Sequence, residues 1–166
     1  EISDSRYAVE KTLKFNTINS DSLRQFIVGD DPNNLTERYY GCNRVEGPDA
    51  MHGTHVAGII AAMRNNNLGM NGVANNVKIM ALRAVPNGDE RDKDVANAIY
   101  YAVDNGATII NMSFGKYYSP GKKVVDDAVA YAASKDVLLV HGAGNESKNS
   151  DVEICYPNRE LTSGTI

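Results

Sequence analysis

The sequence has little of several features that mark specialised protein classes. Its 166 residues contain two cysteines, five prolines and no tryptophan. Two cysteines are too few for the disulfide scaffold of a small secreted domain, and they define no redox compartment. Cys42 and Cys155 either form a disulfide bond or stay as two small buried thiols, and the sequence leaves both alternatives open.

Positive charge and long apolar runs are also scarce. Lys and Arg number 17 against 21 Asp and Glu, which gives a net charge of -4 and argues against a nucleic acid or an anionic membrane as partner. No apolar run approaches the roughly 18 residues that cross a bilayer, and the first residues, from Glu1 to Asp4, are not the basic start of a leader peptide. Because the chain does not begin with Met, we expect that preceding sequence was removed.

The composition is that of an ordinary globular chain, with 42% hydrophobic and 23% charged residues. Residues 1–50 carry many charges, two weak helical patterns and a turn-rich stretch over residues 29–34. In the second pattern Leu23, Phe26 and Ile27 lie at helical spacing behind Ser20 or Asp21 as N-cap. We therefore predict that residues 1–50 are peripheral helices and loops covering a core built by residues 51–166.

Regular structure is expected from Val56 onward. Residues 56–63 are apolar nearly all round and predict a helix buried on every side, which Gly58 lets a neighbour approach closely. The later segments alternate between strand and helix: strands at residues 77–85, 108–113 and 137–140, and helices at 92–105 and 122–134. Strands with consecutive apolar residues are buried on both faces, and strands joined through helices pair in parallel. The sequence thus predicts an α/β fold, a doubly wound, mainly parallel sheet with helices on both faces.

The two helices are expected to turn apolar faces inward, and the strand ends are the place to look for a site. These faces comprise Val95, Ala98, Ile99, Ala102 and Val103, then Val125, Ala128, Val129 and Ala132. In such sheets ligands bind outside the carboxyl ends of the strands, which here are residues 113–115 and 142–145. Both ends are rich in small residues, so backbone amides there can approach a ligand closely.

The densest chemical signal is the run from His52 to Gly58, with imidazoles at His52 and His55 near the start of a helix. The positive end of the helix dipole favours a neutral imidazole, which acts as a base or a metal ligand. A metal site needs a third ligand and usually an intervening carboxylate, and the only other histidine is His141. We expect no metal here, a core position for His55, a buried or partly buried ring without a role for His141, and the open end of the helix for His52.

The run His52-Gly53-Thr54-His55-Val56-Ala57-Gly58 is followed, in order, by Gly72-Val73-Ala74, Asn111-Met112-Ser113-Phe114-Gly115 and Gly142-Ala143-Gly144-Asn145. Over about residues 47–145 these four motifs strongly resemble the subtilisin-like serine proteases. Members of that family are α/β enzymes that cut peptide bonds by acyl transfer, with a Ser/His/Asp triad.

The resemblance implies a role for each matching residue. His52 matches the catalytic base, His55 a structural position, and Asn145 the oxyanion-hole donor. Two further segments match the substrate-binding walls. Ser113, Phe114 and Gly115 match the strand that pairs with the substrate backbone, and Gly142, Ala143 and Gly144 match the opposite wall of the primary specificity pocket. Small residues in that wall imply an open slot for a sizeable apolar side chain.

Two motifs of the family are missing. No Asp-Ser/Thr-Gly tripeptide supplies the catalytic aspartate, and no Gly-Thr-Ser-Met-Ala run supplies the nucleophile. Ser163 lies in a string of the wrong order and is expected to be a tail serine, while Ser113 matches the substrate strand. The family's catalytic domains are larger than this chain. We therefore expect a central fragment of a serine endopeptidase, inactive alone.

Other expectations also follow from the resemblance. Residues 65–71 are similar to a loop that binds a structural calcium in many subtilases, although an Asn-rich loop is often only a turn; no cofactor is required for catalysis. The expected partners are a polypeptide substrate and either the complementing remainder of the protease or a second copy. The expected location is secreted or at the cell envelope. The alternative function is a non-catalytic peptide-binding module or pseudoprotease, and a nucleotide site lacks its Gly-x-Gly-x-x-Gly run.

Overall fold

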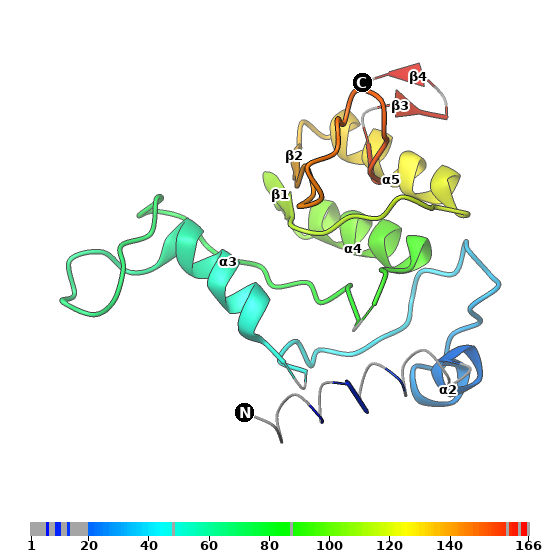
Figure 1. The fold of residues 1–166 in the computed structure, drawn as a ribbon, viewed down its shortest axis with the longest axis horizontal. Helices are drawn as coiled ribbons and strands as arrows, with labels where there is room; N and C mark the ends of the chain where they lie inside the picture. Colours follow the sequence, from blue (N-terminus) through cyan, green and yellow to red (C-terminus); the bar gives the residue numbers. More distant parts are fainter. Residues whose placement is uncertain are drawn as a thin grey trace.

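The computed structural model describes residues 6, 9, 10, 13, 20–47, 49–86, 88–158, 160–162, 164 and 165. Its helices are α2 (Ser20–Ile27), α3 (Met51–Ala61), α4 (Asp92–Asp104) and α5 (Lys122–Ser134). Its strands are β1 (Ile109–Met112), β2 (Leu138–His141), β3 (Glu160–Leu161) and β4 (Gly164–Thr165). Figure 1 shows α4, α5, β1 and β2 gathered into one body, with α3 well apart from it.

The centre of that body is the β1–α5–β2 unit. The two strands pair in parallel, with Ile109 opposite Leu138 and Met112 opposite His141, which confirms the predicted parallel arrangement. The last two helices begin and end within a residue of the predicted bounds. Strands β3 and β4 form a small antiparallel pair that the sequence did not predict.

The core lies between the two helices and one face of the sheet. In α5 the predicted inner residues are all buried: Val125, Ala128, Val129 and Ala132. In α4 the buried apolar residues are Val95, Ala96, Ile99 and Ala102, so Ala96 is more deeply buried than the predicted Ala98. Met112, Val137 and Leu161 complete this cluster. Apolar residues at helical spacing thus bury one stripe of each helix, which is the main source of stability in this body.

The other face of the sheet is uncovered within the described residues. Side chains alternate along each strand, so that Ile109, Leu138 and Val140 point away from the core and are about half exposed or more. Helices α4 and α5 share one cluster with Met112 and therefore lie on the same face. The expectation of helices on both faces is not met in the described part of the chain.

The predicted strand over residues 77–85 does not form. This segment runs between α3 and α4, takes part in no strand pairing in the described structure, and leaves Val77, Ile79 and Met80 well exposed. Extended backbone becomes a strand only when a neighbour accepts and donates its ladder hydrogen bonds. An apolar run in the sequence is therefore insufficient by itself to form a strand.

The predicted burial of the helix that begins near His52 is also wrong, because α3 contains no buried residue. Its C-terminal turn is instead closed by the returning chain, where Val73 N donates to Ile59 O at 3.0 Å and Ala74 N to Ile60 O at 2.8 Å. A Cβ at Gly58 would meet open space, whereas a Cβ at Gly72 would lie 2.4 Å from Ala62 N. The glycine that permits close approach is therefore Gly72.

Charged side chains attach the N-terminal segment to α4. Arg24 of α2 pairs with Asp94 at 2.5 Å, and Lys93 Nζ donates to Asp30 Oδ2 and Glu37 Oε2 at 2.8 Å each. Helix α2 begins at Ser20, one of the two residues predicted as its N-cap, but Phe26 is 90% exposed. The first weak helical pattern lies mostly outside the described residues. The boundary near residue 50 stays a prediction.

Candidate active site

The carboxyl ends of β1 and β2 bring the two predicted substrate-binding segments to one edge of the sheet. Because the strands are parallel and in register, the chain leaves both at the same edge, and Gly142 N donates to Met112 O at 3.1 Å there. Ser113–Gly115 follow β1 and Gly142–Asn145 follow β2. The structure therefore places these two segments side by side.

Close contacts with neighbouring side chains hold the Ser113–Gly115 segment in place. Phe114 packs against the core and meets the His141 ring edge-on, with centroids 6.3 Å apart. A Cβ at Gly115 would lie 2.6 Å from Cys155 Sγ and 3.1 Å from the His141 ring. Only glycine fits at 115 without displacing these neighbours. The two cysteines are free thiols, with Cys42 exposed and Cys155 partly buried, so the disulfide alternative is not realised.

Asn145 lies at the surface of the same edge. Its backbone N–H donates to Glu146 Oε2 at 3.0 Å, while its side-chain amide has no hydrogen-bond partner among the described residues. A side-chain N–H that is free and exposed can donate to an oxygen of a bound ligand. This is the property that the oxyanion role requires.

His52 occupies the second position of α3 and is exposed. Figure 1 shows α3 apart from the β1–β2 sheet, so the structure does not bring His52 and Asn145 together. His55 is exposed as well, and its predicted core position is wrong. The physical reason is the same for both histidines: the described residues include no layer that packs over α3.

Ser113 has the environment of a loop residue. Its Oγ accepts a hydrogen bond from Asn111 Nδ2 at 2.9 Å, and no imidazole among the described residues bonds to it. A nucleophilic serine needs an adjacent base, so this geometry favours the predicted substrate-strand position of Ser113. Ser163 lies outside the described residues.

Two side-chain oxygens of the Asn-rich loop at residues 65–71 accept hydrogen bonds from within the loop. Asn71 Oδ1 accepts from Asn65 N and Asn66 Oδ1 accepts from Leu68 N, both at 3.0 Å. Within the described part of the chain no three His, Cys, Asp or Glu side chains gather to hold a metal ion. These two hydrogen bonds close turns within the loop. A calcium ion held mainly by carbonyl oxygens of this loop stays a prediction.

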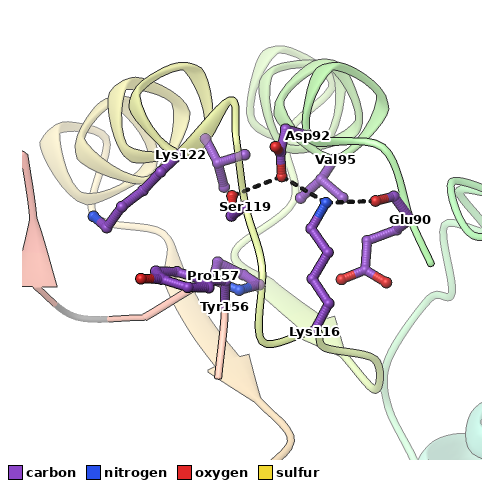
Figure 2. A pocket seen from close by; sticks show the side chains of 9 residues that line it. Glu90, Asp92, Val95, Lys116, Ser119, Lys122, Tyr156 and Pro157 are labelled. Carbon is purple, nitrogen blue, oxygen red and sulfur yellow. Dashed lines mark hydrogen bonds and ion pairs between the residues drawn. The ribbon is translucent and has the colours of Figure 1, made fainter. Parts of the chain in front are cut away.

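A buried ion pair next to the substrate segment was not predicted (Figure 2). Lys116 Nζ lies 2.8 Å from Asp92 Oδ1 and donates to Glu90 O at 2.7 Å. The Asp92 carboxylate also accepts from Ser119 Oγ at 2.8 Å and from Gly121 N at 2.7 Å. No spacing signal reveals this cluster, because its hydrogen-bonded partners lie up to 29 residues apart in the sequence.

The Lys116 main chain is fixed at the same point. It forms an antiparallel bridge with Tyr156, in which Lys116 N donates to Tyr156 O at 3.2 Å and Tyr156 N donates to Lys116 O at 2.7 Å. Lys116 therefore joins the end of the substrate segment, the start of α4 and the 154–157 segment. Together with the start of α5, these three segments line a partly open void of about 10 Å³, room for about one water molecule.

Glu90 stands beside this void with an unusual environment. It is only 4% exposed, and its Oε1 has no hydrogen-bond partner in the described structure. Burial raises the pKa of this carboxyl above its ordinary value, because a buried charge lacks solvation.

His141 gives the fold a testable pH dependence. Burial lowers the pKa of its ring, and its Nε2 is buried without a partner among the described residues. As the pH falls, the unfolded chain takes up this proton first, so the stabilisation is present above about pH 6.5 and is lost as the pH falls through the lowered folded pKa. We expect the Tm of the chain to fall between about pH 7.5 and pH 5.5, and to fall less in His141→Gln. An equal fall in both proteins would contradict this assignment.

Comparisons of the sequence with a family model and with individual known proteins point to the same family. The sequence model of the Subtilase family matches residues 18–163. "Thermophilic serine proteinase" of Bacillus sp. (strain AK1) is 44% identical over 116 residues, which are 69% of this chain and 28% of that protein. "Thermitase" of Thermoactinomyces vulgaris is 43% identical over 95 residues, 57% of this chain and 33% of that protein. The chain thus spans a third or less of the length of these relatives.

A solved structure confirms the fold class. A mutant of the protease domain of PatA matches with a TM-score of 0.51 at 31% sequence identity, covering 63% of this chain and 38% of that chain. The parallel β1–β2 pair and its helices are thus part of an incomplete subtilisin-like α/β fold. Because the family match covers most of the sequence and includes both strand-end segments, this chain belongs to the subtilase family.

Proposed function

We propose that this chain is the part of a subtilisin-type serine endopeptidase that carries the catalytic base, the substrate strand and the oxyanion donor. The observation that supports this most is the shared edge of β1 and β2. There Ser113–Gly115 and Gly142–Asn145 lie side by side, with the Asn145 side chain free to donate.

In this proposal each group has a defined task. His52 takes the proton from the nucleophilic serine and returns it to the leaving amine. Asn145 donates to the oxygen on which negative charge develops. The backbone of Ser113–Gly115 pairs with the substrate as an added strand, and Gly142–Gly144 form the opposite wall of a slot for an apolar side chain.

We further propose that the 166 residues have no peptidase activity alone. They contain neither an Asp-Ser/Thr-Gly nor a Gly-Thr-Ser-Met-Ala run, and α3 with His52 stands apart from the sheet edge. A base without its nucleophile and orienting acid cannot carry out acyl transfer. In this proposal the missing groups belong to other parts of the same polypeptide.

Exposed apolar side chains support the need for additional polypeptide. Such side chains lie on the open face of β1–β2, on α3 and on residues 77–82. A soluble protein rarely leaves such surface uncovered, so we propose that the remainder of the protease or a second copy packs here. None of the described helices is long and apolar enough to cross a bilayer. A secreted or cell-envelope location is proposed from the family resemblance.

Peptide hydrolysis tests the function directly. The protein encoded by the longest reading frame over these residues, called the longest reading frame below, should cleave an unstructured protein such as casein. Its His52→Ala variant and the isolated 166-residue chain should not. A control variant, His55→Ala, separates loss of a base from loss of any histidine in α3, and we expect it to retain more activity than His52→Ala. If the longest reading frame binds peptides but cleaves none, the proposed enzyme function is wrong and the alternative, a non-catalytic peptide-binding module, is supported.

A further inference from the structure

A hydrogen bond connects the loops that follow β1 and β2. Tyr117 Oη donates to Glu146 Oε2 at 2.9 Å, between residues 29 positions apart. Tyr117 lies two residues beyond Gly115, and Glu146 directly follows Asn145. The bond therefore connects the loop just after the predicted substrate strand to the residue next to the predicted oxyanion donor.

Glu146 also holds the backbone of its neighbour. The same oxygen, Oε2, accepts the N–H of Asn145 at 3.0 Å. The preceding residue, Gly144, has a φ of +88°, and a Cβ there would lie 2.9 Å from Glu146 Oε2 and 3.2 Å from Tyr117 Oη. Gly144 thus provides both the left-handed turn and the space for this carboxylate. The Glu146 side chain therefore holds the peptide group between Gly144 and Asn145 in place.

Lys148 supports the tyrosine from one side. Its Nζ lies 3.9 Å from the centroid of the Tyr117 ring and 2.9 Å from Glu153 Oε2. A cation over the face of a ring is attracted by it, which favours the ring orientation seen here. The hydrogen bonds from Tyr117 and from the Asn145 N–H hold the pKa of Glu146 below its ordinary value, so this acceptor stays ionised.

We propose that Tyr117 and Glu146 are positioning residues that orient Asn145 toward the developing oxyanion. The inference rests on the proposed function. Glu146 acts through the Asn145 backbone and Tyr117 acts through Glu146, so neither touches the reacting atoms. An oxyanion donor is effective only when it is held in place before the reaction, and a small displacement weakens it.

Kinetics of the longest reading frame test this role. Tyr117→Phe removes one hydroxyl and should lower kcat about five- to tenfold with KM changed less than about twofold, since the donor acts mainly in the transition state. Glu146→Gln keeps an acceptor and should retain more activity than Glu146→Ala. Tyr118→Phe is the matched control, because Tyr118 is 75% exposed and has no hydrogen bond in the described structure.

A double-mutant cycle separates positioning from a general structural effect. In an Asn145→Ala background the donor is already lost, so adding Tyr117→Phe should change kcat by less than about twofold. An equal five- to tenfold loss in both backgrounds, or a change in KM alone, would overturn the proposal.

A second measurement needs no activity. In the longest reading frame, hydrogen exchange of the Asn145 amide should become several-fold faster in Tyr117→Phe and in Glu146→Ala, and stay unchanged in Tyr118→Phe. Unchanged exchange in all three variants would overturn the proposal. If exchange rises but the longest reading frame cleaves nothing, the positioning of Asn145 is upheld and the proposed function fails.

Discussion

Replacing Lys116 with methionine should lower the free energy of unfolding of the chain by about 3 kcal/mol, at the lower end of losses measured for broken buried ion pairs. Lys116 and Asp92 are 8% and 6% exposed, so the variant leaves a buried carboxylate without its cation. The effect is limited because Ser119 and Gly121 still donate to Asp92. Urea unfolding followed by circular dichroism measures the change.

The matched control for this prediction is Lys123→Met on the same protein. Lys123 pairs with Asp127 one helical turn away, but the two side chains are 70% and 49% exposed. Solvent screens such a pair, so its loss should leave the unfolding midpoint nearly unchanged. Equal midpoints for Lys116→Met and Lys123→Met would show that the Lys116 cluster does not stabilise the fold.

Replacing Asn145 with alanine should reduce kcat of the longest reading frame about 10²- to 10³-fold, the size measured when the corresponding donor is removed from subtilisin itself. KM should change little, because the lost hydrogen bond forms with charge that appears only in the transition state. Steady-state kinetics on a peptide nitroanilide gives both constants.

Asn149→Ala controls for the loss of an asparagine in the same loop. Asn149 lies four residues further along, and its side-chain oxygen accepts a hydrogen bond from Asp151 N at 3.0 Å. Its kcat should stay within about twofold of the parent, as expected for a group that makes no contact in the transition state. A similar loss in both variants, or none in Asn145→Ala, would contradict the assignment of Asn145.

Local sequence patterns predicted the α4–β1–α5–β2 body closely. The apolar stripe of α5, from Val125 to Ala132, lies within the helix Lys122–Ser134, and its helical spacing is a local property of the sequence. The parallel pairing of β1 and β2 follows from the helix that joins them. These features depend on neighbours in the sequence, so a pattern is sufficient to find them.

The failed predictions concern segments whose burial depends on distant parts of the polypeptide. Residues 77–85 have a strand composition, and α3 has the composition of a core helix, yet both are exposed in the described structure. An apolar pattern records that a segment is suited to burial but not which surface covers it. The same holds for His52, whose motif is specific although its chemical partners are not beside it.

The groups that sequence reasoning missed are polar and distant from one another in the chain. Tyr117 meets Glu146 because the loops that follow β1 and β2 converge at one edge of the sheet. Lys116 meets Asp92 because the loop after β1 reaches the start of α4. Charged residues in loops have no period, and most of them are solvated. Only the folded arrangement shows that Lys116 is buried while Lys123 is not.

Labelling with a fluorophosphonate probe, followed by peptide mapping, tests the central claim most directly. We predict that the isolated 166-residue chain takes no label. The longest reading frame should be labelled at one serine in a Gly-Thr-Ser-Met-Ala run, and its His52→Ala variant should label far more slowly. A label on any serine of these 166 residues, with Ser113 the first to inspect, or labelling that is independent of His52, would contradict subtilisin-type catalysis by this protein.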